Sequence, residues 1–309
     1  MTYRPTKILL AIDGSETAAL AAEAAVDLAD RAGAELNVVH VREVFPRRSY
    51  APIRRYTARE AARRSRLCEQ SAEELLAEQV REIQAAGGSV VGVHPSNGRP
   101  ADEILALGGE LGVDLIVLGS RGLGMVKRLA AGSVSEEVAR RAACPVLVVR
   151  GEDGAWPPRR IIVGDDSSTG AREAGELAVG IGKLFGAEML LVRAHPVIVP
   201  MFEAVRYAQN TAATSDDALR RQEMDLESRA RGLEGELGPR PRVRVTEGEA
   251  TSVILRAAEE SGGPALVAVG RRGLGVVDRL RLGSVSAGVL RGANGPVLVV
   301  PDPECRRAL

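Results

Sequence analysis

The stretch LGSRGLGMVKRLAAGSVSEEVARRAACPVLVV, from Leu118 to Val149, returns as VGRRGLGVVDRLRLGSVSAGVLRGANGPVLVV, from Val269 to Val300. Of the 32 aligned positions, 20 are identical, all at an offset of 151 residues. The beginnings of the two halves match as well, because KILLAIDGSETA from Lys7 aligns with RIIVGDDSSTGA from Arg160. A repeat with a period of about half the chain indicates a duplicated domain.

The length of 309 residues agrees with two domains of ordinary size. We predict that domain 1 covers residues 1–152 and that domain 2 covers residues 153–309. The connection falls in GEDGAWPP, residues 151–158, where glycine and proline suit an exposed linker.

Short aliphatic runs alternate with longer helical patterns in each half. The runs are continuous in apolar residues, as is typical of strands in a parallel sheet that is covered on both faces. The first helical pattern follows Asp13-Gly14-Ser15, which supplies a helix cap. We therefore predict an α/β fold of two tandem repeats, each a five-stranded parallel sheet between helices in a Rossmann-like, doubly wound arrangement. The expected strands are residues 8–12, 36–41, 90–93, 115–118, 146–149, 160–165, 189–194, 242–246, 265–269 and 297–300, and the expected helices of the first half are 17–32, 58–86, 101–111 and 134–142.

Charge and cysteine usage exclude several classes of protein. Lys+Arg and Asp+Glu number 41 each, and this zero net charge argues against general binding to nucleic acids or anionic membranes. No apolar run approaches the roughly 18 residues of a membrane helix, and the start MTYRP lacks the apolar core of a signal peptide. We therefore expect a cytoplasmic protein. Cys68, Cys144 and Cys305 have no Cys-x-x-Cys spacing, and only three histidines are present, so we expect no metal site.

A glycine pattern follows the fourth expected strand of each half. In the first half Gly119 and Gly122 lie three residues apart, and Gly132-Ser133 opens the next helix. Glycine lets an anion approach the backbone, and a helix start offers unpaired N–H groups with a partial positive charge. Glycine loops also serve only to turn the chain tightly, but the same loop in both repeats favours a phosphate site. The chain has neither G-x-G-x-x-G after the first strand nor the G-K-[ST] of a Walker A loop, which disfavours a dinucleotide site and a P-loop.

The pattern G-x2-G-x9-G-[ST] after a DLIV strand, closed by CPVLVV, resembles the tandem form of the universal stress protein family, in its ATP-binding branch. The resemblance covers both halves and implies an adenine nucleotide α-hydrolase-like fold that binds ATP, or AMP or ADP, with Mg²⁺ as a companion of ATP. It implies that the ends of the first two strands border the adenosine, while the loop and the helix start contact ribose and phosphates. The implied cofactor-binding residues are Asp13, Val41, Gly119, Arg121, Gly122, Gly132, Ser133, Val134 and Ser135 in the first half, and Asp166, Ala194, Gly270, Arg272, Gly273, Gly283, Ser284, Val285 and Ser286 in the second.

The second half departs from this pattern in three places. Asp165 adds a second carboxylate, Ala194 is smaller than the usual aliphatic residue, and Pro264-Ala265 replaces Asp114-Leu115. A second carboxylate near a triphosphate is unfavourable unless Mg²⁺ or a hydrogen-bond donor compensates it. We therefore expect the first site to be the stronger one.

Few residues beside the motif suit catalysis. His40 lies near the end of the second strand, but Arg193 takes its place in the repeat, so a packed histidine is favoured over a general base. Arg121 and Arg272 suit phosphate contacts and solvated loops equally well, and for Ser133 a helix cap is favoured over a phosphorylation site. We expect an adenine nucleotide-dependent stress-response regulator with at most slow ATP hydrolysis and no catalytic residues. The alternatives are a genuine ATPase or ATP-dependent enzyme, and an interaction module that needs no nucleotide.

Two further expectations concern partners. The arginines of residues 47–66 have few acids among them, which suits a solvated loop, a lid over the phosphates or a patch for an acidic partner. In the family that the chain resembles, paired domains meet through their last strands, so residues 145–149 and 296–300 are expected to join the halves as an intrachain pseudo-dimer. A homodimer and an unknown protein partner remain open. Because aromatic residues make up 3% of the chain, a bound adenine is expected to lie against aliphatic side chains and backbone.

Overall fold

The computed structural model describes residues 3–43, 74, 76–85, 87–120, 132–151, 156–195, 208–237, 240–271 and 282–302. Much of the expected helix 58–86 lies outside these residues, and residues 74 and 76–85 of it are helical. The arginines of residues 47–66 also lie outside them.

The first half alternates strands and helices as expected from its sequence. Its elements are β1 (Lys7–Ile12), α1 (Glu16–Ala32), β2 (Glu35–Glu43), β3 (Val90–Gly98), α3 (Pro100–Leu111), β4 (Leu115–Gly119), α4 (Ser133–Arg141) and β5 (Val146–Val149).

The second half repeats this scheme. Its elements are β6 (Arg160–Gly164), α5 (Thr169–Phe185), β7 (Glu188–His195), α6 (Ala208–Leu237), β8 (Arg242–Glu247), α7 (Ala250–Glu259), β9 (Ala265–Gly270), α8 (Ser284–Gly292) and β10 (Val297–Val300).

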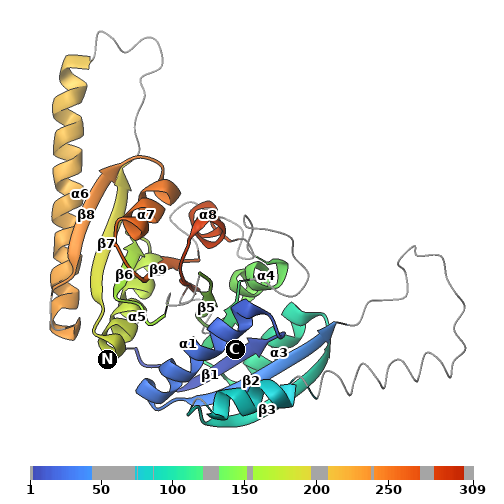
Figure 1. Ribbon diagram of the computed structural model, residues 1–309. Coiled ribbons are helices and arrows are strands. Elements are labelled where there is room, and N and C mark those ends of the chain that lie inside the picture. Colours follow the sequence, from blue (N-terminus) through green and yellow to red (C-terminus); the bar gives the residue numbers. More distant parts are fainter. Residues whose placement is uncertain are drawn as a thin grey trace, which may run out of the picture.

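The described strands form one ten-stranded sheet in the order β3-β2-β1-β4-β5-β10-β9-β6-β7-β8 (Figure 1). Within each half all neighbouring strands are parallel, and each half has the doubly wound order in which the first strand lies in the middle. The predicted α/β fold with two tandem five-stranded parallel sheets is confirmed.

Local signals explain where the helices begin and end. The Ser15 hydroxyl accepts a hydrogen bond from the Ala18 N–H (3.2 Å) at the start of α1. The helix ends at Gly33, whose φ of 63° suits glycine because it has no Cβ. Helix α3 begins with Pro100, which lacks the N–H that a helix start leaves unpaired, and ends at Gly112, again with a φ of 63°.

Two hydrophobic layers cover the two faces of the sheet. On one face α1, α5, α6 and residues 76–85 pack over alternate strand residues such as Leu10 and Val117. On the other face α3, α4, α7 and α8 pack over the remaining ones, such as Leu9 and Ile116. Because both faces of the central strands are buried, their sequences are continuous apolar runs.

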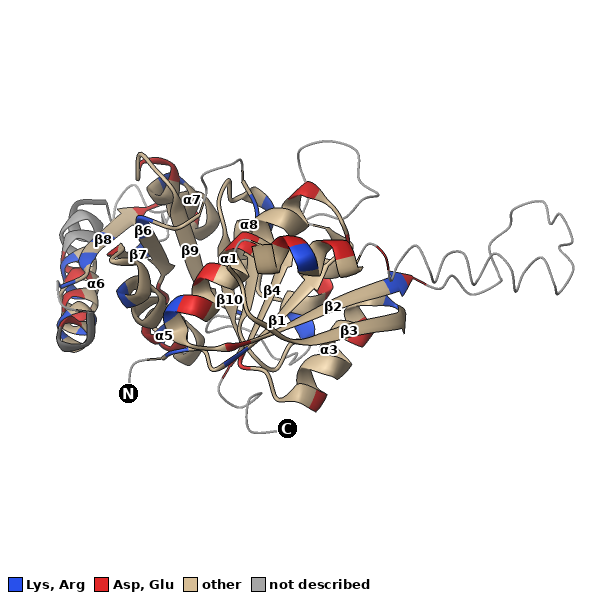
Figure 2. Cartoon of the chain, turned by 60° about the horizontal axis from the view of Figure 1, so that its bottom comes forward, with Lys and Arg blue, Asp and Glu red and all other residues tan. Residues whose placement is uncertain are grey.

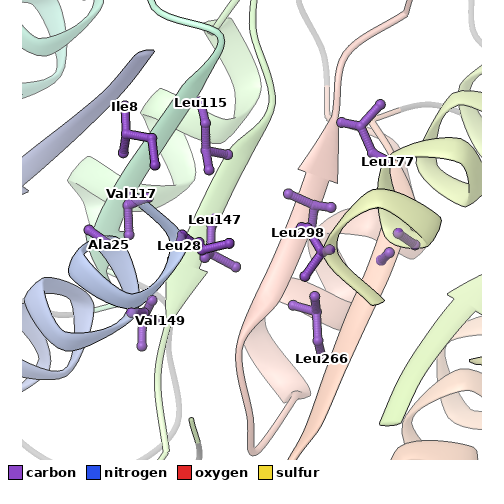
Figure 3. Close-up of a cluster of buried hydrophobic side chains, with 14 of the residues drawn as sticks. Ile8, Ala25, Leu28, Leu115, Val117, Leu147, Val149, Leu177, Leu266 and Leu298 are labelled. Carbon is purple, nitrogen blue, oxygen red and sulfur yellow. The ribbon is translucent and has the colours of Figure 1, made fainter. Parts of the chain in front are cut away.

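The two halves join through their last strands. Strands β5 and β10 pair antiparallel, with Leu147 opposite Leu298, so the runs at residues 146–149 and 297–300 meet at the junction. Both leucines are fully buried, and Figure 3 shows them on either side of the junction. Trp156 adds a second contact, because its ring packs edge-on against Phe185 of α5 while its Nε1 donates to Asp27 of α1 (3.2 Å).

Strand β3 is longer than its apolar run. It continues from the expected residues 90–93 to Gly98 and pairs with β2 along its length. Residues on one side of β3, including Val91 and Val93, are exposed. The second part of β3, residues 94–98, contains no Val, Ile or Leu, so it lacks the aliphatic run by which the central strands are recognised.

Candidate functional site

The motif residues gather where the strand order of each half reverses. In the first half β1 lies between β2 and β4, and the chain leaves β1 and β4 toward opposite sides. In open α/β sheets, ligands bind at this switch point, beyond the carboxyl ends of the strands. Asp13 directly follows β1, and Gly119 is the last residue of β4.

Gly119 packs directly against the start of α1. A Cβ at this position would lie 2.7 Å from the carbonyl carbon and oxygen of Thr17, which is closer than real Cβ contacts. Gly270 is equivalent, because its Cβ would lie 2.6 Å from the carbonyl carbon of Gly170 in α5. The first glycine of each motif is therefore required for close packing between the end of the strand and the first helix, whether or not a ligand binds.

Asp13 shapes the turn into α1. Its Oδ1 accepts a hydrogen bond from the Ser15 N–H (3.0 Å), and Ser15 in turn caps the helix. In the second half the Oδ1 of Asp166 accepts from the Ser168 N–H (3.0 Å), and Ser168 caps α5. Asp166, and not the adjacent Asp165, is thus the structural counterpart of Asp13.

The start of α4 faces this switch point without a side-chain cap. Gly132 is the cap residue and has no side chain, and its own N–H donates to the carbonyl of Ser120 (2.6 Å). No side chain of the described residues caps the first turn, which carries the exposed Ser133 and the half-buried Val134. Among the described residues, the first N–H groups of the helix thus have no side-chain acceptor, as at helix starts that bind anions.

Ser135 has a different role from Ser133. Its hydroxyl is buried within hydrogen-bond distance of the carbonyls of Gly132 (3.0 Å) and Ser120 (3.2 Å). Ser286 likewise donates to the Gly270 carbonyl (2.6 Å). Both hydroxyls thus bond backbone carbonyls of their own motif, and the predicted contact of Ser135 and Ser286 with a nucleotide stays a prediction.

The second motif has the same backbone. Gly283 caps α8 without a side chain, its N–H donates to the Arg271 carbonyl (2.9 Å), and Ser284 is exposed while Val285 is half-buried. Val41, Ala194, Val134 and Val285 all pack beside the hydrophobic layer formed with α3, α4, α7 and α8. The remaining predicted residues Arg121, Gly122, Arg272 and Gly273 lie outside the described residues.

Comparison with known proteins matches residues 5–150 and again residues 158–301 to the Universal stress protein family. The chain belongs to this family. The universal stress protein YxiE of Bacillus subtilis is 39% identical over 157 residues, which cover 47% of this chain and 98% of YxiE. Universal stress protein Rv2005c of Mycobacterium tuberculosis is 32% identical over 192 residues, 60% of this chain and 61% of that protein. The crystal structure of a universal stress protein from Archaeoglobus fulgidus DSM 4304 superposes with a TM-score of 0.64 at 24% identity, covering 96% of each chain, and this likeness shows the shared fold.

The second half of this universal stress protein contains a buried ionic network with no counterpart among the described residues of the first half. The Asp165 carboxylate is fully buried and accepts from Arg193 (2.5 Å) and from Arg229 of α6. Arg193 also bonds Asp225 of α6 (2.7 Å), and burial lowers the pKa of Arg229. The extra carboxylate beside the second site is thus balanced by two guanidinium groups.

Sequence reasoning missed Asp225 and Arg229. Both belong to α6, which carries charges of both signs (Figure 2), and nothing in that pattern distinguishes the two residues that bond Arg193 and Asp165. The one available signal was the exchange of His40 for Arg193 between the repeats. His40 itself is half-buried, and its Nδ1 lies 3.0 Å from the Ile12 carbonyl, which agrees with a packed histidine.

Another departure of the second half does not concern the site. Asp114 precedes β4, at the opposite end of that strand from Gly119. Its carboxylate accepts from the N–H (2.8 Å) and the hydroxyl (2.7 Å) of Thr6, and so it fixes the segment before β1. Its replacement by Pro264 therefore changes how the segment before β6 is held and not the glycine motif.

Two cavities lie apart from the predicted nucleotide-binding residues. One of about 550 Å³ separates α1 from residues 76–85, and one of about 520 Å³ lies beside α3 near Cys144. None of the described residues that line them belongs to the predicted nucleotide-binding set. The candidate site remains the switch point, because a phosphate at a helix start is bound by unpaired backbone N–H groups and does not need an enclosed cavity.

Two other kinds of site are not found within the part of the chain that the structure describes. No helix there is both long and apolar enough to span a membrane. Nor do three or more His, Cys, Asp or Glu side chains there come together as metal ligands.

Proposed function

We propose that this universal stress protein binds an adenine nucleotide, ATP or its products AMP and ADP, at the glycine motif of each half and acts as a nucleotide-dependent stress-response regulator. The observation that supports this most directly is the start of α4. There the first N–H groups lie beyond the carboxyl ends of β1 and β4, and the capping residue is a glycine without a side chain. The same arrangement at α8 gives the second site.

The surroundings of the helix start suit a nucleotide. Asp13 has one carboxylate oxygen engaged in the turn, and the valines Val41 and Val134 offer aliphatic surface beside it. An adenosine would lie against these side chains, while the phosphates would accept from the backbone of α4. When bound, Mg²⁺ would neutralise part of the triphosphate charge.

A regulator is favoured over an ATPase because the described residues offer little for catalysis. Phosphoryl transfer needs a group that orients the nucleophile and charges that stabilise the transferred phosphoryl group. His40 bonds to backbone, and Asp13 holds the turn into α1. Steady turnover above about 1 s⁻¹, the low end of ordinary enzymes, would favour the ATPase instead.

Replacing Ser133 by Asp tests the proposal at the first site. A carboxylate in the first turn stabilises a helix, so Ser133→Asp should leave folding unchanged. It would repel a phosphate at the same N–H groups, so we expect ATP affinity at the first site to fall at least about tenfold, the effect of 1.4 kcal/mol. Isothermal calorimetry with ATP, with and without Mg²⁺, measures the change.

The matched variants are Ser133→Ala, which should keep most of the affinity, and Ser284→Asp, which should remove binding at the second site while the first site still binds ATP. Unchanged ATP affinity in a Ser133→Asp, Ser284→Asp double variant would refute nucleotide binding at the two helix starts. Mass spectrometry of the denatured, freshly purified protein would identify any nucleotide that it carries.

The regulatory part of the proposal requires that bound nucleotide changes the surface offered to a protein partner. We expect ATP to slow backbone amide exchange in α4 and α8, because phosphate contacts order the first turns of both helices. Equal exchange with and without saturating ATP would leave nucleotide storage as the better function.

A further inference from the structure

Two buried arginines cross the junction between the halves. Arg271, which directly follows β9 in the second half, donates to the carbonyls of Arg140 (3.2 Å) and Ala142 (3.0 Å) at the end of α4 in the first half. Arg150, which directly follows β5 in the first half, donates to the carbonyl of Leu290 (2.5 Å) near the end of α8 in the second. Both arginines are more than nine-tenths buried, with exposed fractions of 3% and 7%.

Each arginine bonds the last turn of a helix whose first turn belongs to a glycine motif. A cation beside the C-terminal carbonyls of a helix interacts favourably with the helix dipole, as does an anion beside its N-terminus. Helix α4 has nine residues, so its two ends are only about 13 Å apart at 1.5 Å per residue. Arg271 therefore acts on the same short dipole as a phosphate at Ser133.

The main chain of Arg271 belongs to the second motif. Its N–H donates to the Val300 carbonyl at the end of β10 (2.6 Å), and its carbonyl accepts from Gly283 (2.9 Å), the residue that caps α8. Its side chain meanwhile holds the helix of the other half. Arg271 thus connects the start of α8, at the second site, with the end of α4, at the first site.

A second connection runs from the first half to α8 of the second half. The Val149 carbonyl accepts from the N–H of Ser120 (2.8 Å), whose carbonyl in turn accepts from Gly132, the residue that caps α4. Arg150 directly follows Val149 and reaches α8. Arg271 follows the fourth strand of the second half, whereas Arg150 follows the fifth strand of the first half. The two connections therefore do not occupy equivalent positions in the repeat.

We propose that Arg271 and Arg150 are positioning residues that couple the two nucleotide sites, so that a nucleotide at one site raises the affinity of the other. The coupling rests on the proposed nucleotide binding. A ligand at the start of α8 orders Gly283, which bonds the Arg271 carbonyl, and through the Arg271 side chain also the end of α4, so the first site loses less freedom when it binds. Energetic coupling between sites is reciprocal, so the effect runs in both directions.

The experiment is a thermodynamic cycle on the full chain with ATP·Mg²⁺ as the probe. Ser284→Asp blocks the second site, and calorimetry then gives the affinity of the first site alone. We expect that affinity to be at least fivefold weaker than in the wild-type chain, since known couplings begin at about that size. In the Arg271→Ala background the same block should change first-site affinity less than twofold, and Arg271→Lys should retain part of the coupling through its charge.

A matched control crosses the same pair of helices at the surface. Arg291 of α8 forms an ion pair with Glu136 of α4, and its side chain is 54% exposed. An exposed pair contributes little, so Arg291→Ala should leave the coupling intact. If Arg271→Ala fails to fold, Arg150→Ala breaks the other connection and is expected to lower the coupling as well.

The outcomes separate the two proposals. First-site affinity that does not depend on the second site in the wild-type chain would overturn the coupling and leave nucleotide binding standing. Coupling that survives both arginine variants would overturn the role of these residues. Absence of ATP binding to the wild-type chain would overturn the proposed function itself, and the coupling with it.

Discussion

Asp165 occupies the position that Ile12 has in the first half, since each residue precedes the aspartate of the turn. The exchange places a carboxylate in the layer under α6, where its side chain is fully buried. Such a charge is tolerated only when paired and hydrogen-bonded, and here Arg193 and Arg229 supply the partners. At the scale of single residues, the two halves have therefore diverged beside a shared backbone.

Replacing Asp165 by Asn tests the network. We expect the free energy of unfolding to fall by about 3–5 kcal/mol, because both buried guanidinium groups lose their carboxylate. Chemical denaturation at neutral pH measures the loss. Asp165→Ile with Arg229→Gln, which removes both the buried carboxylate and one of its guanidinium partners, should recover part of it, since Arg193 keeps Asp225.

Asp166→Asn is the control for this prediction. Asn also accepts the Ser168 N–H, and position 166 is exposed, so the change should stay within about 0.5 kcal/mol. An Asp165→Asn variant as stable as Asp166→Asn would show that the network contributes nothing to stability.

The helices differ in the residue that caps their first turn. Helices α1 and α5 have serine caps, α7 has the carboxylate of Glu249, and α4 and α8 have glycine. The two glycine-capped helices are the ones that begin at the proposed nucleotide sites. At the scale of elements, side chains cap the first turns of α1, α5 and α7, whereas α4 and α8, like the proline-started α3, have no side-chain cap.

Glu249 gives a pH-dependent prediction for α7. Burial raises the pKa of its carboxyl, but the N–H groups of Thr251 (2.9 Å) and Ser252 (2.8 Å) outweigh this, so the pKa lies below its ordinary value. The pKa is therefore lower in the folded state, and the added stability is present above the unfolded value of about 4.3 and lost as pH falls through the folded one.

Glu249→Gln should consequently cost about 0.5–2 kcal/mol at pH 7, as for other caps, and less at about pH 3. Denaturant unfolding at both pH values measures this. Glu247→Gln is the control, because Glu247 is exposed at the end of β8. An equal cost of Glu249→Gln at both pH values would contradict the assignment of the carboxylate as a charged cap.

At the scale of the whole molecule, the antiparallel pair β5–β10 makes one sheet of two repeats. Leu147 and Leu298 lie opposite one another there and are fully buried. Because the cores of both halves continue through this pair, we expect the chain to unfold in a single calorimetric transition. Leu147→Ala should lower the stability of that whole transition by about 2–5 kcal/mol.

The double variant Leu147→Ala, Leu298→Ala should cost less than the sum of the single ones, because the two side chains meet at one contact. Val91→Ala is the control, since Val91 is 64% exposed on the edge strand β3. Two transitions, of which Leu147→Ala shifts only one, would mean that the halves unfold independently.

Much of the fold could be predicted because the central strands are buried on both faces and their apolar runs are continuous. The second part of β3 was not predicted because residues 94–98 contain no Val, Ile or Leu, and an edge strand with one exposed face can form without an aliphatic run. At the candidate site, the pairing of Asp13 with Asp166 followed from the repeat, and both aspartates hold the same turn. The inward direction of Ser135 did not follow, since spacing in a sequence says nothing about which hydroxyl faces the interior.

The sequence by itself determined the duplication, the order of strands and helices and the glycine motifs, since these depend on patterns local to each segment. Only the tertiary structure decided which distant residues meet: Asp165 with Arg229 of α6, and Arg271 with the end of α4. These contacts join residues separated by 64 and 131 positions. Their partners are one arginine or one backbone carbonyl among many alike, so no local pattern marks them, and only the packing of the two halves into one sheet selects them.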